Sequence, residues 1–384
     1  MIIEKKKRYI PLDGLRGIAI LGVFFVHFPL FPRVTRWGWA GVDLFFVLSG
    51  FLITGILFDN LASPRYFRDF YIRRSLRILP LFFAFWLHIA VLTPTLHFHW
   101  LKGYWAWVAY VGNFLPALAV HQGLDPNFYT NFEFVDHHGF RQTFVIGHLW
   151  TLCIEEQFYF LWPIIVWLVR DRRNLMKMCL VAISLCISAR LILPMLLSDE
   201  LRDSDLVVKL MPTHCEGLMF GAIIALWLRG QNDIRSLRLP WIYGIGAFSI
   251  IAILFSDHFS PGSASEMLLS PWIEQYGLTL IAIVSATFLI AALTSKTAMM
   301  LLSFRPLVAL GEISYGFYIL HWVPRAFVNP PVQSNLIRHG LVIFYFASTF
   351  AVSWMSFRFF ERPFLKLKDR LAPATRSDGS VGGV

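Results

Sequence analysis

The sequence predicts an all-α polytopic membrane protein, a helical bundle of about ten transmembrane helices plus one re-entrant or interfacial helix. Hydrophobic residues make up 57% of the 384-residue chain and charged residues only 15%, which is typical of multi-pass membrane proteins. Apolar stretches near the roughly 20 residues that cross a ~30 Å hydrocarbon layer recur along nearly the whole length. Basic residues gather in the short connections between them, as loops on one side of a membrane do.

Eleven apolar windows follow one another along the chain. They lie near residues 12–30, 38–58, 76–93, 104–120, 148–169, 176–197, 207–228, 240–256, 270–294, 302–322 and 338–360. The basic connections 59–77 and 170–177 can share one side of the membrane only if an even number of crossings separates them. The window 104–120, rich in Trp and Tyr and interrupted by Asn113 and Pro116, is therefore predicted not to cross.

The ten remaining crossings place both termini on the cytoplasmic side. We expect a single membrane-embedded domain over residues 1–370 and a disordered cytoplasmic tail over residues 371–384, which are small and polar. The basic start precedes a span without a small-residue cleavage site, which predicts a retained first helix rather than a signal peptide. No nucleic-acid-binding module accompanies the net charge of +10, so the expected partners include membrane lipids but no nucleic acid.

The first span, "LDGLRGIAILGVFFVHF", carries two ionisable side chains at different depths. Arg16 lies near the inner face, and at ~1.5 Å per residue His27 lies roughly 16 Å deeper. Ionisable groups inside a membrane are costly and are functional candidates by default. A neutral imidazole is well matched to accept a proton near pH 7, which makes His27 a candidate general base. Arg16 is either an interfacial anchor or a functional residue.

The next two spans add an acidic residue and an arginine cluster. Asp43 lies just inside the outer end of the second span, where Ser49 and Gly50 are expected to allow close helix packing. Three arginines at the cytoplasmic mouth of the third span share neighbouring helix faces. They either follow the positive-inside rule or form an anion site for a cytosolic, nucleotide-bearing donor. These arginines are Arg73, Arg74 and Arg77.

Later spans contain further polar candidates. Glu155 and Glu156 point about 100° apart on a helix, and at least one is expected to orient a histidine. Tyr318 and His321 are three residues apart and are expected to face one polar cavity. The other candidates are His148, Trp150, Tyr159, His214, Glu216, Ser314 and Tyr315.

Five histidines in the outer segment match no zinc-binding spacing, so no metal site is predicted. They are His97, His99, His121, His137 and His138.

Together these strings resemble the acyltransferase-3 family of integral membrane O-acyltransferases, and the likeness covers nearly the whole chain. Arg16 and His27 match the arginine and histidine of the family's first span, and the arginine cluster matches its Arg-Arg-x-x-Arg pattern. "WTLCIEEQFY" (150–159) matches the family's W[ST]LxxEEQFY string. "SYGFYILH" (314–321) nearly matches its SYxxYLxH string, with isoleucine at the usual leucine.

The chain also departs from the family's pattern. His214 and Glu216 stand where many members carry an arginine and an aspartate two residues apart. The hydrolase-like C-terminal domain that some members carry is not expected.

The resemblance implies a bacterial inner-membrane enzyme that moves an acyl group, most often acetyl, from acyl-CoA to a hydroxyl of a cell-surface or lipid-linked glycan. Acetyl-CoA is then a donor substrate, and no permanently bound cofactor is expected. His27 is the expected general base, Arg16 acts on the donor side, and Glu155 or Glu156 orients His27. Arg16, Tyr318 or His321 would stabilise the oxyanion that acyl transfer develops.

The remaining candidates have expected places in the same site. Arg73, Arg74 and Arg77 are expected to hold the donor's phosphates. Residues expected around the substrate cavity are Asp43, His148, Trp150, Tyr159, His214, Glu216, Ser314, Tyr315, Tyr318 and His321. Direct transfer and a relay through an acyl-histidine or acyl-serine both stay open.

A proton-coupled transporter of a glycan or drug-like substrate is the alternative interpretation. Such transporters tend to show internal repeats with broken helices at corresponding positions, which the sequence does not reveal.

Overall fold

The computed structural model describes residues 9–31, 35–135, 141–202, 206–230, 238–259, 272–328 and 334–373. The predicted tail at 371–384 lies largely outside these ranges, as do His137 and His138. The structure is a bundle of helices, which confirms the predicted fold class.

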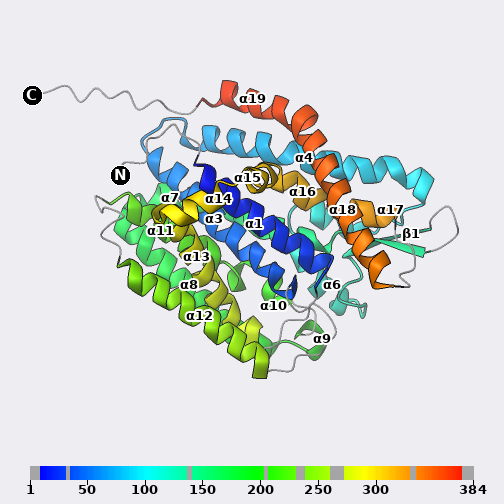
Figure 1. Ribbon diagram of the computed structural model, residues 1–384, viewed down its shortest axis with the longest axis horizontal. Helices are drawn as coiled ribbons and strands as arrows, with labels where there is room; N and C mark the ends of the chain where they lie inside the picture. Colours follow the sequence, from blue (N-terminus) through cyan, green and yellow to red (C-terminus); the bar gives the residue numbers. More distant parts are fainter. Residues whose placement is uncertain are drawn as a thin grey trace, which may run out of the picture.

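Within the described residues, eight helices are long and apolar enough to cross a membrane. Their near-continuous apolar sequence leaves no polar face for water, so each is stable only inside a bundle or in lipid. The helices that form these spans are α1 (Ile10–His27), α3 (Ala40–Asp59), α4 (Tyr66–Leu96), α7 (Trp150–Val169), α8 (Arg172–Leu196), α12 (Leu239–Phe259), α13 (Leu278–Thr294) and α18 (Asn335–Met355). Figure 1 shows α1 and α3 side by side in the middle of the bundle, between α12 and α18 at opposite edges.

The two remaining predicted crossings are not long continuous helices. The window 207–228 contains α10 (Leu206–Lys209), a 3₁₀ turn at Met211–Thr213 and the short apolar helix α11 (Glu216–Leu228). The window 302–322 follows α14 (Lys296–Leu302) and is divided into α15 (Arg305–Glu312) and α16 (Ser314–Leu320), with α17 (Val323–Phe327) after it. Proline stands at the start of both α15 and α17, where its fixed φ favours a new helix. Such breaks are tolerated at membrane depth where protein surrounds them.

The segment predicted not to cross consists of short pieces. They are a 3₁₀ turn at Lys102–Tyr104, α5 (Trp105–Val108), a 3₁₀ turn at Gly112–Phe114 and α6 (Leu115–His121). Next comes a β-hairpin that the sequence analysis did not predict, in which β1 (Asn131–Val135) pairs antiparallel with β2 (Arg141–Val145). Phe132 lies opposite Phe144, and both side chains are buried in the same hydrophobic cluster.

The other described elements are short or extend longer helices. They are 3₁₀ turns at Arg36–Trp39 and Gly147–Leu149, α9 (Asp199–Arg202), π-helical turns at Ile273–Gly277 and Ser356–Glu361, and α19 (Arg362–Leu371). α19 (red in Figure 1) lies across one end of the bundle beside α4.

Close glycine contacts bring the central helices together. A Cβ at Gly50 of α3 would lie 1.9 Å from the backbone oxygen of Leu218 in α11, so only glycine permits this approach. A Cβ at Gly311 of α15 would lie 1.8 Å from the backbone oxygen of Asp13 in α1. The packing role predicted for Gly50 is therefore confirmed, and the two contacts fix α3 against α11 and α1 against α15.

Candidate functional site

A cavity of about 100 Å³ lies between α1, α3, α4, α7 and α16. Five charged side chains contribute to its wall, an unusual concentration for the inside of a membrane protein. These side chains are Arg16, Arg74, Arg77, Glu155 and Glu156. Hydroxyl groups line it as well, from Ser49, Thr151, Tyr159, Ser314, Tyr315 and Tyr318. The structure thus gathers residues from four of the recognised sequence strings around one space.

A chain of hydrogen bonds forms the acidic side of the cavity. The Tyr159 hydroxyl donates to Ser49 Oγ at 2.9 Å, and the Ser49 hydroxyl donates to Glu155. Ser49 is therefore a polar residue of the cavity wall, not only the packing residue that its sequence neighbours suggest. Among the described residues, neither Glu155 nor Glu156 is hydrogen-bonded to His27, so the structure gives no support to a carboxylate that orients this histidine.

The arginine cluster divides between two places. Arg74 and Arg77 line the cavity, and the Arg74 guanidinium lies 4.4 Å from the centre of the Tyr159 ring. Arg73 instead reaches α19, where Nη1 donates to the backbone oxygen of Ala372 at 2.6 Å and lies 3.6 Å from Asp369 Oδ1. Arg73 therefore contacts the C-terminal helix rather than the cavity that Arg74 and Arg77 line.

Arg16 of α1 also lines the cavity. Its Nη1 donates to Asp13 Oδ1 one turn earlier, at 3.0 Å. A guanidinium has five N–H donors, so this bond uses only part of its capacity.

The histidine of α1 lies in a second, adjacent cluster. His27 Nδ1 is 3.0 Å from His321 Nε2, and His321 Nδ1 is 2.6 Å from the backbone oxygen of Tyr318. The His148 ring packs edge-on against His321, with ring centres 4.8 Å apart. Both ring nitrogens of His148 are buried and have no hydrogen-bond partner among the described residues. We call His27, His148 and His321 the histidine cluster.

Tyr318 joins the cavity to the histidine cluster. Its side chain lines the cavity, where its hydroxyl lies 2.5 Å from Thr151 Oγ1 and donates to the backbone oxygen of His148. Its own backbone oxygen accepts the hydrogen bond from His321. His27 itself does not line the cavity and remains partly exposed on the other side of this contact.

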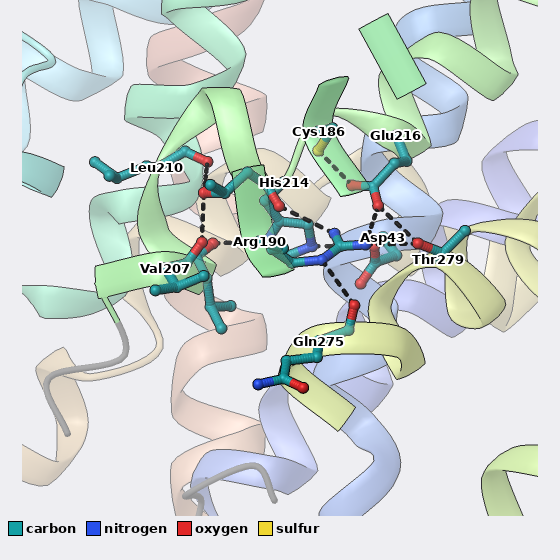
Figure 2. A network of polar contacts seen from close by, with 11 residues as sticks. Asp43, Cys186, Arg190, Val207, Leu210, His214, Glu216, Gln275 and Thr279 are labelled. Atoms are coloured by element: carbon teal, nitrogen blue, oxygen red, sulfur yellow. Dashed lines mark hydrogen bonds and ion pairs between the residues drawn. The ribbon is translucent and has the colours of Figure 1, made fainter. Parts of the chain in front are cut away.

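Three of the predicted cavity residues form a separate network (Figure 2). His214 Nε2 lies 3.2 Å from Asp43 Oδ1, and its Nδ1 lies 2.7 Å from the backbone oxygen of Val208. Glu216 Oε1 pairs with Arg190 Nη2 at 2.5 Å. Trp150 stacks on the His214 ring, with ring centres 5.6 Å apart. Asp43, Trp150, His214 and Glu216 therefore do not line the cavity, contrary to expectation.

Arg190 is the residue of this network that the sequence analysis missed. It is fully buried, and it donates to the backbone oxygens of Thr213 and Gln275 and to the Thr279 hydroxyl. The network therefore ties α8 to α3, α11 and α13. Its sequence signal was a lone arginine inside the apolar window 176–197. We call Asp43, Arg190, His214, Glu216 and Thr279 the closed network.

The described residues contain no group of three or more His, Cys, Asp or Glu side chains placed to hold a metal ion. Of the five outer histidines, His97, His99 and His121 belong to the described part of the chain.

Comparisons with known proteins place these strings in a wider context. The acyltransferase-3 family profile, described as "Acyltransferase domain", matches residues 9–358. The O-acetyltransferase OatA of Staphylococcus aureus strain NCTC 8325 is 28% identical over 380 residues, which cover 94% of this chain and 58% of OatA. A protein of strain COL, provisionally named an O-acetyltransferase, is 29% identical over 375 residues with the same coverage. The chain thus spans somewhat over half the length of these relatives. No solved structure matches it significantly.

Proposed function

The chain belongs to the acyltransferase-3 family of multi-pass membrane proteins, and we propose that it is an O-acetyltransferase. The proposed donor is acetyl-CoA, and the proposed acceptor is a hydroxyl of a cell-surface or lipid-linked glycan. One observation carries the proposal: Tyr318 connects a cavity lined by arginines to the histidine pair that contains His27. The arginines proposed to hold the donor and the histidine proposed as the base for the acceptor therefore lie on opposite sides of Tyr318.

The donor side of the proposal rests on the arginines. Arg74 and Arg77 offer planar, permanently charged donors that suit phosphate oxygens, and Arg16 faces the same space. A volume of about 100 Å³ has room for an acetyl thioester. In the proposed arrangement the thioester end enters this cavity and the arginines hold the phosphates of the nucleotide.

The acceptor side of the proposal rests on His27. In the proposed step the acceptor hydroxyl gives its proton to His27 as its oxygen attacks the thioester carbonyl carbon. The new C–O bond forms, the C–S bond breaks, and the departing CoA thiolate takes the proton back from His27. Both ring nitrogens of His321 are already engaged, and the Tyr318 hydroxyl proton is engaged as well. Arg16 lies eleven residues before His27 in α1, about 16 Å away, so its spare N–H donors act on the donor side of the cavity rather than on the oxyanion.

We also propose that the protein lies in a bacterial inner membrane with both termini in the cytoplasm. The arginines at 73–77 then open toward the compartment that contains acetyl-CoA. The positive-inside distribution of basic loops supports this orientation.

Supplying [¹⁴C]acetyl-CoA to the purified protein in lipid nanodiscs, with glycan from the source cells, tests the proposal. Label is expected in the glycan fraction, and His27→Ala is expected to abolish it. His88→Ala is the matched control, because His88 also lies in a membrane-spanning helix but is exposed on its surface. Label retained on the protein after the donor is removed identifies an acyl-enzyme relay, whereas label only in the glycan identifies direct transfer.

Two results would overturn the proposal. One is full transfer by His27→Ala, because it would show that His27 is not the general base. The other is the absence of any acetyl transfer together with proton-driven movement of glycan across sealed vesicles, which would favour the transporter.

A further inference from the structure

The hydrogen bonds of the histidine pair determine which ring nitrogen carries each proton. His321 Nδ1 lies 2.6 Å from the backbone oxygen of Tyr318. A carbonyl oxygen only accepts hydrogen bonds, so His321 Nδ1 must carry a proton. The remaining question is whether His321 Nε2 carries one as well.

The surroundings of His321 favour a neutral ring. Its side chain is fully buried, and its ring neighbours are aromatic side chains, among them Phe28 and Trp322. Among the described residues, the hydrogen-bonding partners of His321 are a backbone oxygen and another imidazole, and no carboxylate is paired with it. A buried cation without an opposite charge is strongly disfavoured. His321 Nε2 therefore holds a lone pair.

The state of His321 fixes the state of His27. His321 Nε2 lies 3.0 Å from His27 Nδ1, and one of the two nitrogens must donate. Since His321 Nε2 has no proton, His27 Nδ1 is the donor. A neutral imidazole has one proton, so His27 Nε2 is left with the lone pair.

We propose that His321 is a positioning residue that holds His27 in the Nδ1–H tautomer and so makes His27 Nε2 the atom that accepts the proton. The chain of contacts runs from the Tyr318 carbonyl through His321 to His27, with each donor facing an acceptor. This inference rests on the proposed function, in which His27 is the general base. It assigns to His321 the orienting role expected of Glu155 or Glu156.

Solid-state NMR of ¹⁵N-histidine-labelled protein in nanodiscs, recorded without any donor, tests the tautomer directly. The His27 signals are identified by their loss in His27→Ala. In the unaltered protein we expect a protonated Nδ1 and an unprotonated Nε2. In His321→Phe, which keeps a ring but has no nitrogen, that pattern is expected to disappear. An Nε2-protonated His27 in the unaltered protein would overturn the inference.

Kinetics provide the second measurement. His321→Phe is expected to lower kcat about 100-fold or more, the usual contribution of general-base catalysis, with the KM for acetyl-CoA unchanged. His321→Gln is expected to recover most of that loss, because an amide can donate to Tyr318 and accept from His27. Equal activity of His321→Phe and the unaltered protein would also overturn the inference.

A control variant separates this role from general packing. Tyr345→Phe removes a hydrogen bond to the backbone oxygen of Val328 beside Phe28, outside the histidine pair. It is expected to leave the His27 spectrum and kcat unchanged. Because the spectrum needs no donor, an Nδ1–H His27 in a protein that transfers no acetyl would refute the proposed function and leave only the tautomer assignment standing.

Discussion

His214 in the closed network and His321 in the histidine cluster are both buried, and each holds Nδ1 against a backbone oxygen. Their second partners differ. His214 Nε2 faces the carboxylate of Asp43, and His321 Nε2 faces the ring of His27. A carbonyl and a carboxylate both accept, so His214 must carry two protons and a positive charge. The second partner therefore makes His214 half of an ion pair with Asp43, whereas His321 is a neutral ring between Tyr318 and His27.

A similar contrast holds between the arginine of the closed network and the arginines of the cavity. Arg190 is paired with Glu216, and its other donors reach backbone oxygens and the Thr279 hydroxyl. Arg74 and Arg77 contribute instead to the wall of a cavity. Charges that satisfy one another hold helices together, whereas charges that face a cavity can bind a substrate. Variants of the two regions should therefore fail in different ways.

The largest effect is expected where the closed network loses one charge. Arg190→Met leaves Glu216 buried without its opposite charge, which typically costs 3–5 kcal/mol of folding free energy, an order-of-magnitude figure. Denaturant unfolding of the protein in detergent measures the loss. Adding Glu216→Leu to Arg190→Met should recover much of the stability, because no isolated charge remains. A single variant as stable as the unaltered protein would show that the network does not stabilise the fold.

A smaller effect of a different kind is expected in the cavity. Arg74→Gln and Arg77→Gln should each weaken acetyl-CoA binding about 10- to 100-fold, since a hydrogen bond to a charged group contributes roughly 1.5–3 kcal/mol. Isothermal titration with acetyl-CoA measures the affinity. The unfolding free energy should change little. Unchanged affinity in both variants would exclude this cavity as the donor site.

Ser49→Ala should have a weaker effect within the same cavity. It removes the hydroxyl between Tyr159 and Glu155, and a hydrogen bond of this kind contributes about 1 kcal/mol. We expect kcat/KM for acetyl transfer to fall about fivefold. A loss of stability without any kinetic change would show that Ser49 contributes to packing only.

The smallest effect is expected from Arg73→Gln, which is also the matched control for its neighbours. Arg73 is partly exposed and its partner Asp369 is exposed, and such ion pairs contribute roughly 0–1 kcal/mol. Acetyl-CoA affinity should stay within about twofold of the unaltered value. A loss as large as that of Arg74→Gln would place Arg73 in the donor site after all.

The helices were predictable where loop charge and hydropathy agreed. They were less predictable where a local break divides an apolar window into short helices. Loop charges excluded the window 104–120 as a crossing, and the structure divides it into short pieces. The window 302–322 is mostly apolar, so composition did not separate one long helix from two short ones. Pro306 and Pro324 mark the starts of α15 and α17, whereas at the break between α15 and α16 the signal was the charged Glu312. The alternation of Phe132, Glu133 and Phe134 was a strand signal too short to stand out.

The site was predictable as a set of residues but not as a set of contacts. Arg16, Glu155 and Tyr318 belong to distant segments, and the structure brings them to one cavity. Sequence alone does not state which helix face meets which neighbour, so Asp43 and His214 were assigned to the same cavity although they pair with each other outside it. The partner of His27 was mistaken for the same reason. A carboxylate is the usual orienter of a histidine, and here another imidazole occupies that place.

The length of α4 has a consequence for how a donor would reach the protein. Its 31 residues extend about 46 Å, roughly half again the thickness of a bilayer's oily interior. The stretch from Arg77 to the helix end at Leu96 alone measures about 29 Å and fills that interior. The part of α4 before Arg77 then extends beyond that interior. The nucleotide of acetyl-CoA would bind there while still hydrated, and only the uncharged chain that carries the thioester would have to leave water.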